Sequence, residues 1–184
     1  MRNWTIEAAQ LFNYVAPYFV IAIFFAAGQP TGRRAKMNSP RTYSISTEKR
    51  RFNVALIHNF LRSTYWARDI PRSVVARSIR NSLCFGVFYR GQQVGFARVI
   101  TDCATLAYLA DVFVLPEHRG RGVGKMLIRR ILAHRDLQGL RRILLATKDA
   151  YKLYAPFGFK PLTHPERFMT IAAPGVYKKK RASV

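Results

Sequence analysis

The sequence predicts a single α/β domain in which a mixed central sheet is flanked by helices. Two observations favour this class. Apolar runs rich in β-branched and aromatic residues alternate with segments whose apolar residues recur at helical spacing, and a glycine-rich turn joins one buried strand to a helix. With 184 residues and 49% hydrophobic content, the chain can bury one full-sized core. One folded domain is therefore expected.

The domain is expected to begin with a strand that is followed by two helices. Residues 43–46 are strand-like, and residues 52–65 carry apolar side chains at helical spacing. Ser73 is a candidate amino-terminal cap for a second helix that runs to Ile79. Pro71 separates this second helix from the first.

Three strands are expected in the middle of the domain. Residues 83–89 and 93–101 would form a hairpin, because the Arg-Gly-Gln sequence at 90–92 is typical of a tight turn. Residues 107–115 are a nearly continuous apolar run, which predicts a central strand buried on both faces. Pro116 ends that strand.

The last part of the domain is expected to alternate helices and strands. Helices are predicted over 124–134 and 149–154, with a buried strand at 142–146 between them. Short strands near 158–159 and 168–171 would close the fold.

The two ends of the chain differ in composition from the middle. Residues 12–28 are an almost charge-free apolar run, a little shorter than the roughly 18 to 20 residues that span a bilayer. This run is either a membrane or interface anchor or part of an extension upstream of a start at Met37. We expect an amino-terminal extension at 1–42, the folded domain at 43–173 and a basic tail at 174–184.

Charge and cysteine content bear on the partners. The formal net charge of +22 attracts polyanions, which include nucleic acid, anionic lipid and phosphorylated cofactors. Cys84 and Cys103 both lie in apolar runs, and no histidine or cysteine stands at metal-ligand spacing. We expect two buried free thiols, a reducing compartment and no metal site.

The strongest signal is the turn that links the run at 107–115 to the helix after it. Its alternating glycines let the backbone approach a ligand closely, and the start of the helix points free amide hydrogens at that ligand. This combination predicts an anion site whose positive charge suits a pyrophosphate. The predicted contacts are Arg119, Gly120, Arg121, Gly122, Val123, Gly124 and Lys125.

Two common nucleotide loops do not fit this turn. The dinucleotide pattern Gly-x-Gly-x-x-Gly fails because Lys125 or Leu127 stands at its last position. The triphosphate loop fails because Met126 stands where Ser or Thr must bind magnesium, and because Arg119 replaces its first glycine.

The turn is instead similar to the acetyl-CoA signature of the GNAT superfamily of N-acetyltransferases, Gln/Arg-x-x-Gly-x-Gly/Ala, through Arg119, Gly122 and Gly124. Residues 112–116 resemble the fourth strand of that family, and residues 153–159 resemble its closing Leu-Tyr-x-x-x-Gly-Phe segment. The resemblance implies a sheet that splays between its fourth and fifth strands, with acetyl-CoA bound in the cleft and no metal. It further implies acetyl transfer to an amine by direct attack in a ternary complex.

The resemblance also implies roles for individual residues. Tyr154 matches the tyrosine that acts as general acid toward the departing thiolate in similar enzymes. A backbone amide among Val112, Phe113 and Val114 would polarise the thioester carbonyl. Thr147 stands where many members carry an asparagine that contacts pantetheine, and Asp149 could share that contact.

The general base is less clearly indicated. Asp111 is the acidic residue of a long apolar strand, and burial without a charged partner would suit it to accept a proton near neutral pH. Strand alternation places Asp111 on the face opposite Tyr108 and Val112 unless a bulge intervenes. Asp111 is therefore either the base or a structural hydrogen-bonding residue, and Tyr108 is an alternative contact for the acceptor.

The acceptor is expected to lie under the segment between the first two helices. Tyr65 and Trp66 in that segment could hold an amine by cation–π contact, or Trp66 could simply cap the core. The acceptor itself is not encoded in any pattern we can identify. A cytosolic cofactor predicts a cytoplasmic enzyme, or one that faces the cytoplasm from a membrane, as a monomer or homodimer. A basic protein that binds nucleic acid or the ribosome is the alternative function.

Overall fold

The structure, a computed structural model, describes residues 43–177. The predicted extension at 1–42, with its apolar run, and residues 178–184 of the predicted tail lie outside the described residues. The domain limits therefore stay a prediction. No helix within residues 43–177 is both long enough and apolar enough to cross a membrane.

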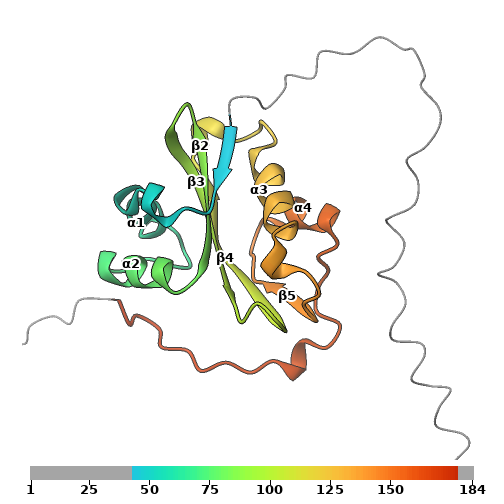
Figure 1. The fold of residues 1–184 in the computed structure, drawn as a ribbon. Helices are drawn as coiled ribbons and strands as arrows, with labels where there is room; N and C mark the ends of the chain where they lie inside the picture. Colours follow the sequence, from blue (N-terminus) through green and yellow to red (C-terminus); the bar gives the residue numbers. More distant parts are fainter. Residues whose placement is uncertain (1–42, 178–184) are drawn as a thin grey trace, which may run out of the picture. The chain divides into compact units, whose positions relative to one another are not determined.

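A five-stranded mixed sheet with helices on both faces confirms the predicted fold class (Figure 1). The strands follow chain order across the sheet, and all neighbours are antiparallel except β4 and β5, which are parallel. The strands are β1 (Tyr43–Ser46), β2 (Leu83–Tyr89), β3 (Gln92–Thr101), β4 (Leu106–Val114) and β5 (Arg142–Leu145). The helices are α1 (Val54–Leu61), α2 (Arg72–Arg80), α3 (Val123–Leu132) and α4 (Tyr151–Tyr154).

Each face of the sheet carries its own apolar layer. On one face, strands β2, β3 and β4 pack against α3, where Leu127 and Ile128 are fully buried. On the other face, Phe96 and Phe113 pack with Ile57 of α1 and with residues of α2. Figure 1 shows α1 and α2 on one side of the sheet and α3 and α4 on the other. Any group that reaches through the sheet must therefore pass where the strands separate.

The first two helices are shorter or start differently than the sequence predicts. Helix α1 is capped by Asn53, whose side chain accepts a hydrogen bond from the Leu56 amide at 3.0 Å, and it ends at Leu61 rather than at residue 65. The hydroxyl groups of Ser63 and Thr64 hydrogen-bond to backbone carbonyl oxygens at the end of the helix, which favours a turn there. Ser73 does not cap α2, because the helix starts at Arg72 and Pro71 takes the cap position.

The predicted hairpin between β2 and β3 is confirmed. Tyr89 pairs with Gln92, so two residues form the turn. Both have a positive φ, 48° at Arg90 and 83° at Gly91. This combination suits the right-handed twist of a two-stranded hairpin and explains the glycine.

The strands of the second half differ more from prediction. Strand β4 is not buried on both faces along its whole length, since Leu106 and Tyr108 near its start are exposed. No strand forms at 158–159 or 168–171 within the described residues, and Met169 and Ile171 are almost fully exposed. Pro161 and Pro165 lack the amide hydrogen that a strand needs, which weakens sheet pairing in this segment. Helix α4 is also shorter than the predicted 149–154.

The two cysteines occupy different environments. Cys84 is buried in β2, as expected, and burial raises the pKa of its thiol to about 11. Cys103 is exposed, which corrects the expectation that both are buried. It lies in the turn between β3 and β4 with a φ of 59°. Both cysteines are free thiols.

Candidate active site

The glycine-rich turn has the geometry of an anion site. Gly120 and Gly122 have φ values of 70° and 77°, which explains why glycine stands there. A Cβ atom at either position would meet no heavy atom within 4 Å, so the space above the turn is open. The first hydrogen bond within α3 runs from the Met126 amide to the Gly122 carbonyl at 3.0 Å. The amides of Val123, Gly124 and Lys125 precede that bond and are free to donate to a ligand.

The side chains around this turn divide into two groups. Arg121 and Lys125 are exposed and extend the positive surface. Arg119 is also exposed, but its Nε donates to the Val114 carbonyl at 2.9 Å, so it ties the turn to the end of β4. Gly124 has a different role, because a Cβ there would lie 3.4 Å from Leu153 Cδ1. A methyl group at position 124 would therefore be in contact with α4, and a larger side chain would have to displace Leu153.

A contact that joins β1 to the start of the turn, here called the brace, was not predicted from the sequence. The Tyr43 hydroxyl and His118 Nδ1 are 2.9 Å apart, and the rings of Tyr43 and Tyr89 lie beside the imidazole. His118 immediately precedes Arg119, so this contact fixes the start of the turn. Tyr43 and His118 are separated by 75 residues, and no local pattern could have joined them.

Strands β4 and β5 separate next to this turn, as the resemblance implied. Their last pair is Leu109 with Leu145, after which β5 ends and β4 continues to Val114. Just beyond that point β4 contains a β-bulge, because Ala97 of β3 faces both Asp111 and Val112. Asp111 has a φ of 54°, which is unusual for a residue with a side chain.

The predicted backbone contacts are distributed around this bulge. Val112 and Val114 pack on the α3 face, whereas Phe113 faces α1 and stacks on Phe60 with ring centroids 3.9 Å apart. The bulge also turns the Asp111 carboxylate to the α1 face, as the alternation argument allowed.

The expectation that Asp111 is an isolated carboxylate is wrong. Its Oδ2 accepts a hydrogen bond from Arg98 Nε at 2.7 Å, and the two side chains are only 11% and 16% exposed. Arg98 also reaches Ser82 Oγ at 3.4 Å. This ion pair favours the second of the two roles expected for Asp111, that of a structural hydrogen-bonding residue.

Tyr154 lies where two segments from opposite faces of the sheet meet. Its ring is buried, and desolvation raises the pKa of the hydroxyl to about 12, with smaller contributions from Tyr65 and Asp149. The hydroxyl makes no hydrogen bond within residues 43–177, yet it is not sealed from solvent. Tyr65 approaches from the segment between α1 and α2, and its hydroxyl accepts from the Lys148 amide at 3.2 Å. The meeting point lies just past the end of β5.

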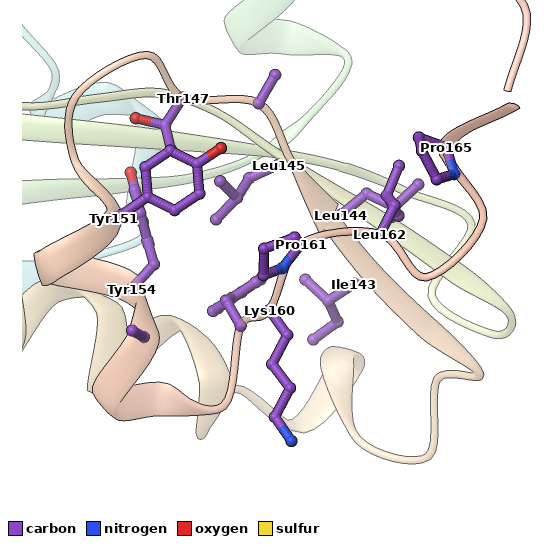
Figure 2. Close-up of a pocket in the computed structure, with 13 residues that line it drawn as sticks. Ile143, Leu144, Leu145, Thr147, Tyr151, Tyr154, Lys160, Pro161, Leu162 and Pro165 are labelled. Atoms are coloured by element: carbon purple, nitrogen blue, oxygen red, sulfur yellow. The ribbon is translucent and has the colours of Figure 1, made fainter.

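A cavity of about 400 Å³ lies against β5 and α4. Figure 2 shows Thr147, Tyr151 and Tyr154 together at one end of it and Leu162 and Pro165 at the other. Thr147 Oγ1 accepts from the Ala150 amide at 3.0 Å, so it is engaged in the loop itself. No residue of β4 lines the cavity. It therefore lies beside the gap between β4 and β5 rather than in it.

The predicted acceptor residues are only partly brought together. Tyr65 and Trp66 are 55% and 47% exposed and form an edge-to-face pair with centroids 4.9 Å apart. This exposure argues against Trp66 as a cap of the core. Tyr108 pairs with Ile100 and Leu144 in the part of β4 before the bulge, away from the cavity lining. Within residues 43–177, no group of three acidic, cysteine or histidine residues is placed to hold a metal.

Comparisons with known proteins agree on one family. The family model described as "Acetyltransferase (GNAT) domain" matches residues 80–161. A Gibberella zeae protein named as an acetyltransferase is 33% identical over 135 residues, which cover 61% of this chain and 75% of that protein. An N-acetyltransferase by name from Gracilaria tenuistipitata var. liui is 31% identical over 110 residues, which cover 56% of this chain and 59% of that protein.

Solved structures give the same result. A Xanthomonas campestris pv. campestris protein assigned to the GNAT family superposes with a TM-score of 0.72 at 54% identity, covering 74% of this chain and 97% of its own. A Clostridium acetobutylicum protein crystallised with acetyl-CoA superposes with a TM-score of 0.54 at 13% identity, covering 71% and 94%. The second likeness concerns the fold alone.

Proposed function

The chain belongs to the GNAT acetyltransferase family, and from this premise we propose that it transfers the acetyl group of acetyl-CoA to the amino group of an acceptor. One observation carries the proposal. The amides at the start of α3 are free to donate, Arg119 ties this turn to the part of β4 beyond its last pair with β5, and Gly124 lies against Leu153, the residue before Tyr154. An anion site and a hydrogen-bond donor are thus held close to the point where the two strands separate.

The turn would bind the pyrophosphate of acetyl-CoA. Backbone amides of residues 120–125 donate to the phosphate oxygens, and Arg121 and Lys125 add charge. Pantetheine would then follow the gap between β4 and β5 toward Tyr154, past Thr147 and Asp149. A backbone amide among Val112, Phe113 and Val114 would polarise the thioester carbonyl.

Transfer proceeds by direct attack of the acceptor nitrogen on this carbonyl. The C–N bond forms, the C–S bond breaks, and one proton passes from nitrogen to sulfur overall. Tyr154 stays protonated at neutral pH, because the pKa of its hydroxyl is raised to about 12. An alkyl thiol such as cysteine ionises at about 8.5, so the phenol is the weaker acid. Tyr154 therefore assists by a hydrogen bond to the sulfur as charge develops there, and the proton lost from the amine completes the transfer.

The acceptor contacts are proposed from exposure and position. Tyr65 and Trp66 present two aromatic rings at the gap on the α1 face, which suits a cationic amine. Tyr108 would contribute to a larger acceptor. A cytoplasmic location is proposed because the acetyl donor is cytosolic.

Two experiments test the proposal. Calorimetry should give one acetyl-CoA bound per chain, and the cofactor should raise the melting temperature. A screen of spermidine, an aminoglycoside, a lysine-containing peptide and a free peptide amino terminus should then identify an acceptor by thiol release. Absence of binding at millimolar acetyl-CoA would contradict the proposal. Salt-sensitive binding to random RNA without acetyl-CoA would favour the alternative, which rests on the net charge of +22.

A further inference from the structure

A buried ion pair lies at the β4 bulge and has no place in the reaction described above. Arg98 extends from β3 on the α1 face, and its Nε is 2.7 Å from the Asp111 carboxylate. Its other end lies 3.4 Å from the hydroxyl of Ser82, just before β2. The guanidinium thus links three consecutive strands of the sheet at one level.

Both the pair and the backbone beneath it need an explanation. A side chain with φ near 54° is strained, and such strain persists only where the surroundings impose it. Removing two charges from water is also unfavourable unless the geometry of the pair is good. The pair and the strained residue coincide at Asp111, so the simplest reading is that the ion pair imposes the bulge.

The bulge determines how β4 leaves the sheet. Pairing with β5 ends at Leu109, and the strand is bent two residues later. A bulge re-aims the residues that follow it. The next three residues, Val112 to Val114, are those whose amides the proposed function assigns to the thioester carbonyl.

We propose that Arg98 is a positioning residue, which holds the Asp111 carboxylate and through it fixes the bulge that aims the backbone of Val112–Val114 at the thioester. This inference rests on the proposed function. It assigns Asp111 to the structural role and leaves proton removal from the acceptor to another group, such as ordered water.

The test measures the carbonyl stretching frequency of bound acetyl-CoA rather than turnover, so it needs no acceptor. Acetyl-CoA labelled with ¹³C in the acetyl carbonyl is bound to the full chain, and the carbonyl stretch is recorded by isotope-edited infrared spectroscopy. Hydrogen bonding from a backbone amide lowers this frequency relative to free acetyl-CoA. The wild type should show that lowered frequency.

Three variants separate the two roles of Asp111. Arg98→Met removes the donor and keeps the apolar stem, and Asp111→Ala removes the acceptor, so both should lose the lowered frequency. Asp111→Asn keeps an oxygen for Arg98 and tolerates positive φ, so it should retain the lowered frequency. If Asp111 were instead the base, all three variants would keep the wild-type frequency, since a base touches the acceptor and not the thioester. That result overturns the inference.

Controls separate failure of this inference from failure of the proposed function. Arg50→Met breaks an ion pair of 3.2 Å with Glu48 that is exposed on both sides, and it should leave the frequency unchanged. If the wild type binds no acetyl-CoA, the proposed function fails. If it binds with an unshifted carbonyl, the proposed contact between a β4 amide and the carbonyl fails together with this inference, while cofactor binding at the glycine turn stands. If Arg98→Met does not fold, the contrast between Asp111→Ala and Asp111→Asn decides the question.

Discussion

The proposed cofactor side and the proposed acceptor side of this domain are specified over very different distances along the chain. The glycine turn and the start of α3 are contiguous, and apart from the contact of His118 with Tyr43 their geometry depends on neighbouring residues. The acceptor side is assembled from remote pieces, since Tyr65 reaches an amide 83 residues away. A local site should respond to single backbone changes, and an assembled site to changes in side-chain contacts.

Tyr154→Phe should have the largest effect, on chemistry alone. We expect turnover to fall roughly a hundred- to a thousand-fold, because the hydrogen bond from the hydroxyl strengthens only when charge reaches sulfur. Acetyl-CoA affinity and stability should change little, since the hydroxyl has no hydrogen-bond partner among residues 43–177. Single-turnover kinetics and calorimetry measure the two quantities. Near-normal turnover with chemistry rate-limiting would show that the thiolate leaves by another route.

Gly122→Ala should act on the cofactor side, through binding. A side chain at φ 77° costs about 1 to 2 kcal/mol, and the turn would relax away from the conformation that presents its amides. We expect the Kd for acetyl-CoA to rise about tenfold, with little change in turnover at saturation.

Gly139→Ala is the matched control for that variant. Gly139 has a φ of 71° and open space around it, but lies outside the turn. It should lower the melting temperature by a similar amount and leave the Kd unchanged. Equal losses of affinity in the two variants would show that Gly122 acts only through general stability.

Tyr65→Phe should have a smaller effect, confined to the acceptor side. It removes the oxygen that accepts from the Lys148 amide, an interaction worth about 0.5 to 1.5 kcal/mol. We expect kcat/KM for the acceptor to fall about two- to tenfold while acetyl-CoA affinity stays the same. If acetyl-CoA affinity fell as much as kcat/KM for the acceptor, Tyr65 would act on the cofactor side, and the proposed division into two sides would be contradicted.

The smallest expected effect is on stability at alkaline pH. The pKa of Tyr154 is raised in the fold to about 12 from an ordinary value of 10.0, so the folded state holds its proton more tightly than the unfolded chain. Its contribution to stability is full below pH 10 and is lost as pH rises toward 12. Tyr154→Phe should therefore lose less stability than the wild type across this window. Cys84, whose pKa is raised to about 11, titrates in both proteins and cancels in the difference. If the melting temperatures of the wild type and of Tyr154→Phe fall equally as the pH rises through this window, the raised pKa of Tyr154 is contradicted.

Features that depend on neighbouring residues could be predicted from the sequence. The hairpin at 90–91 and the turn at 120–122 need positive φ, and glycine marks both. The end of α1 was predicted too late, because hydroxyl contacts of Ser63 and Thr64 outweigh a periodic apolar pattern. Local signals therefore predicted most of the elements and the glycine turn, but not every element or boundary.

Features that depend on remote partners could not be predicted. No pattern in the residues around Asp111 predicts that its carboxylate pairs with Arg98 on another strand. The contact between the Tyr43 hydroxyl and His118 could not be predicted from the sequence either. The predicted strand at 168–171 shows the opposite error, since strand-like residues there have no paired neighbour within the described chain. A strand forms only where a second segment pairs with it, and the residue pattern of one segment does not predict that second segment.

The contact between Gly124 and Leu153 has a consequence for how such sequences diverge. Leu153 borders the space that a side chain at 124 would occupy, and it immediately precedes Tyr154. An alanine at 124 would just touch the leucine at 3.4 Å, whereas a larger residue would displace it and the helix that carries Tyr154. Homologues with a bulkier residue at 124 should therefore carry a smaller one at 153. The two positions, 29 residues apart in the printed sequence, should covary as a pair.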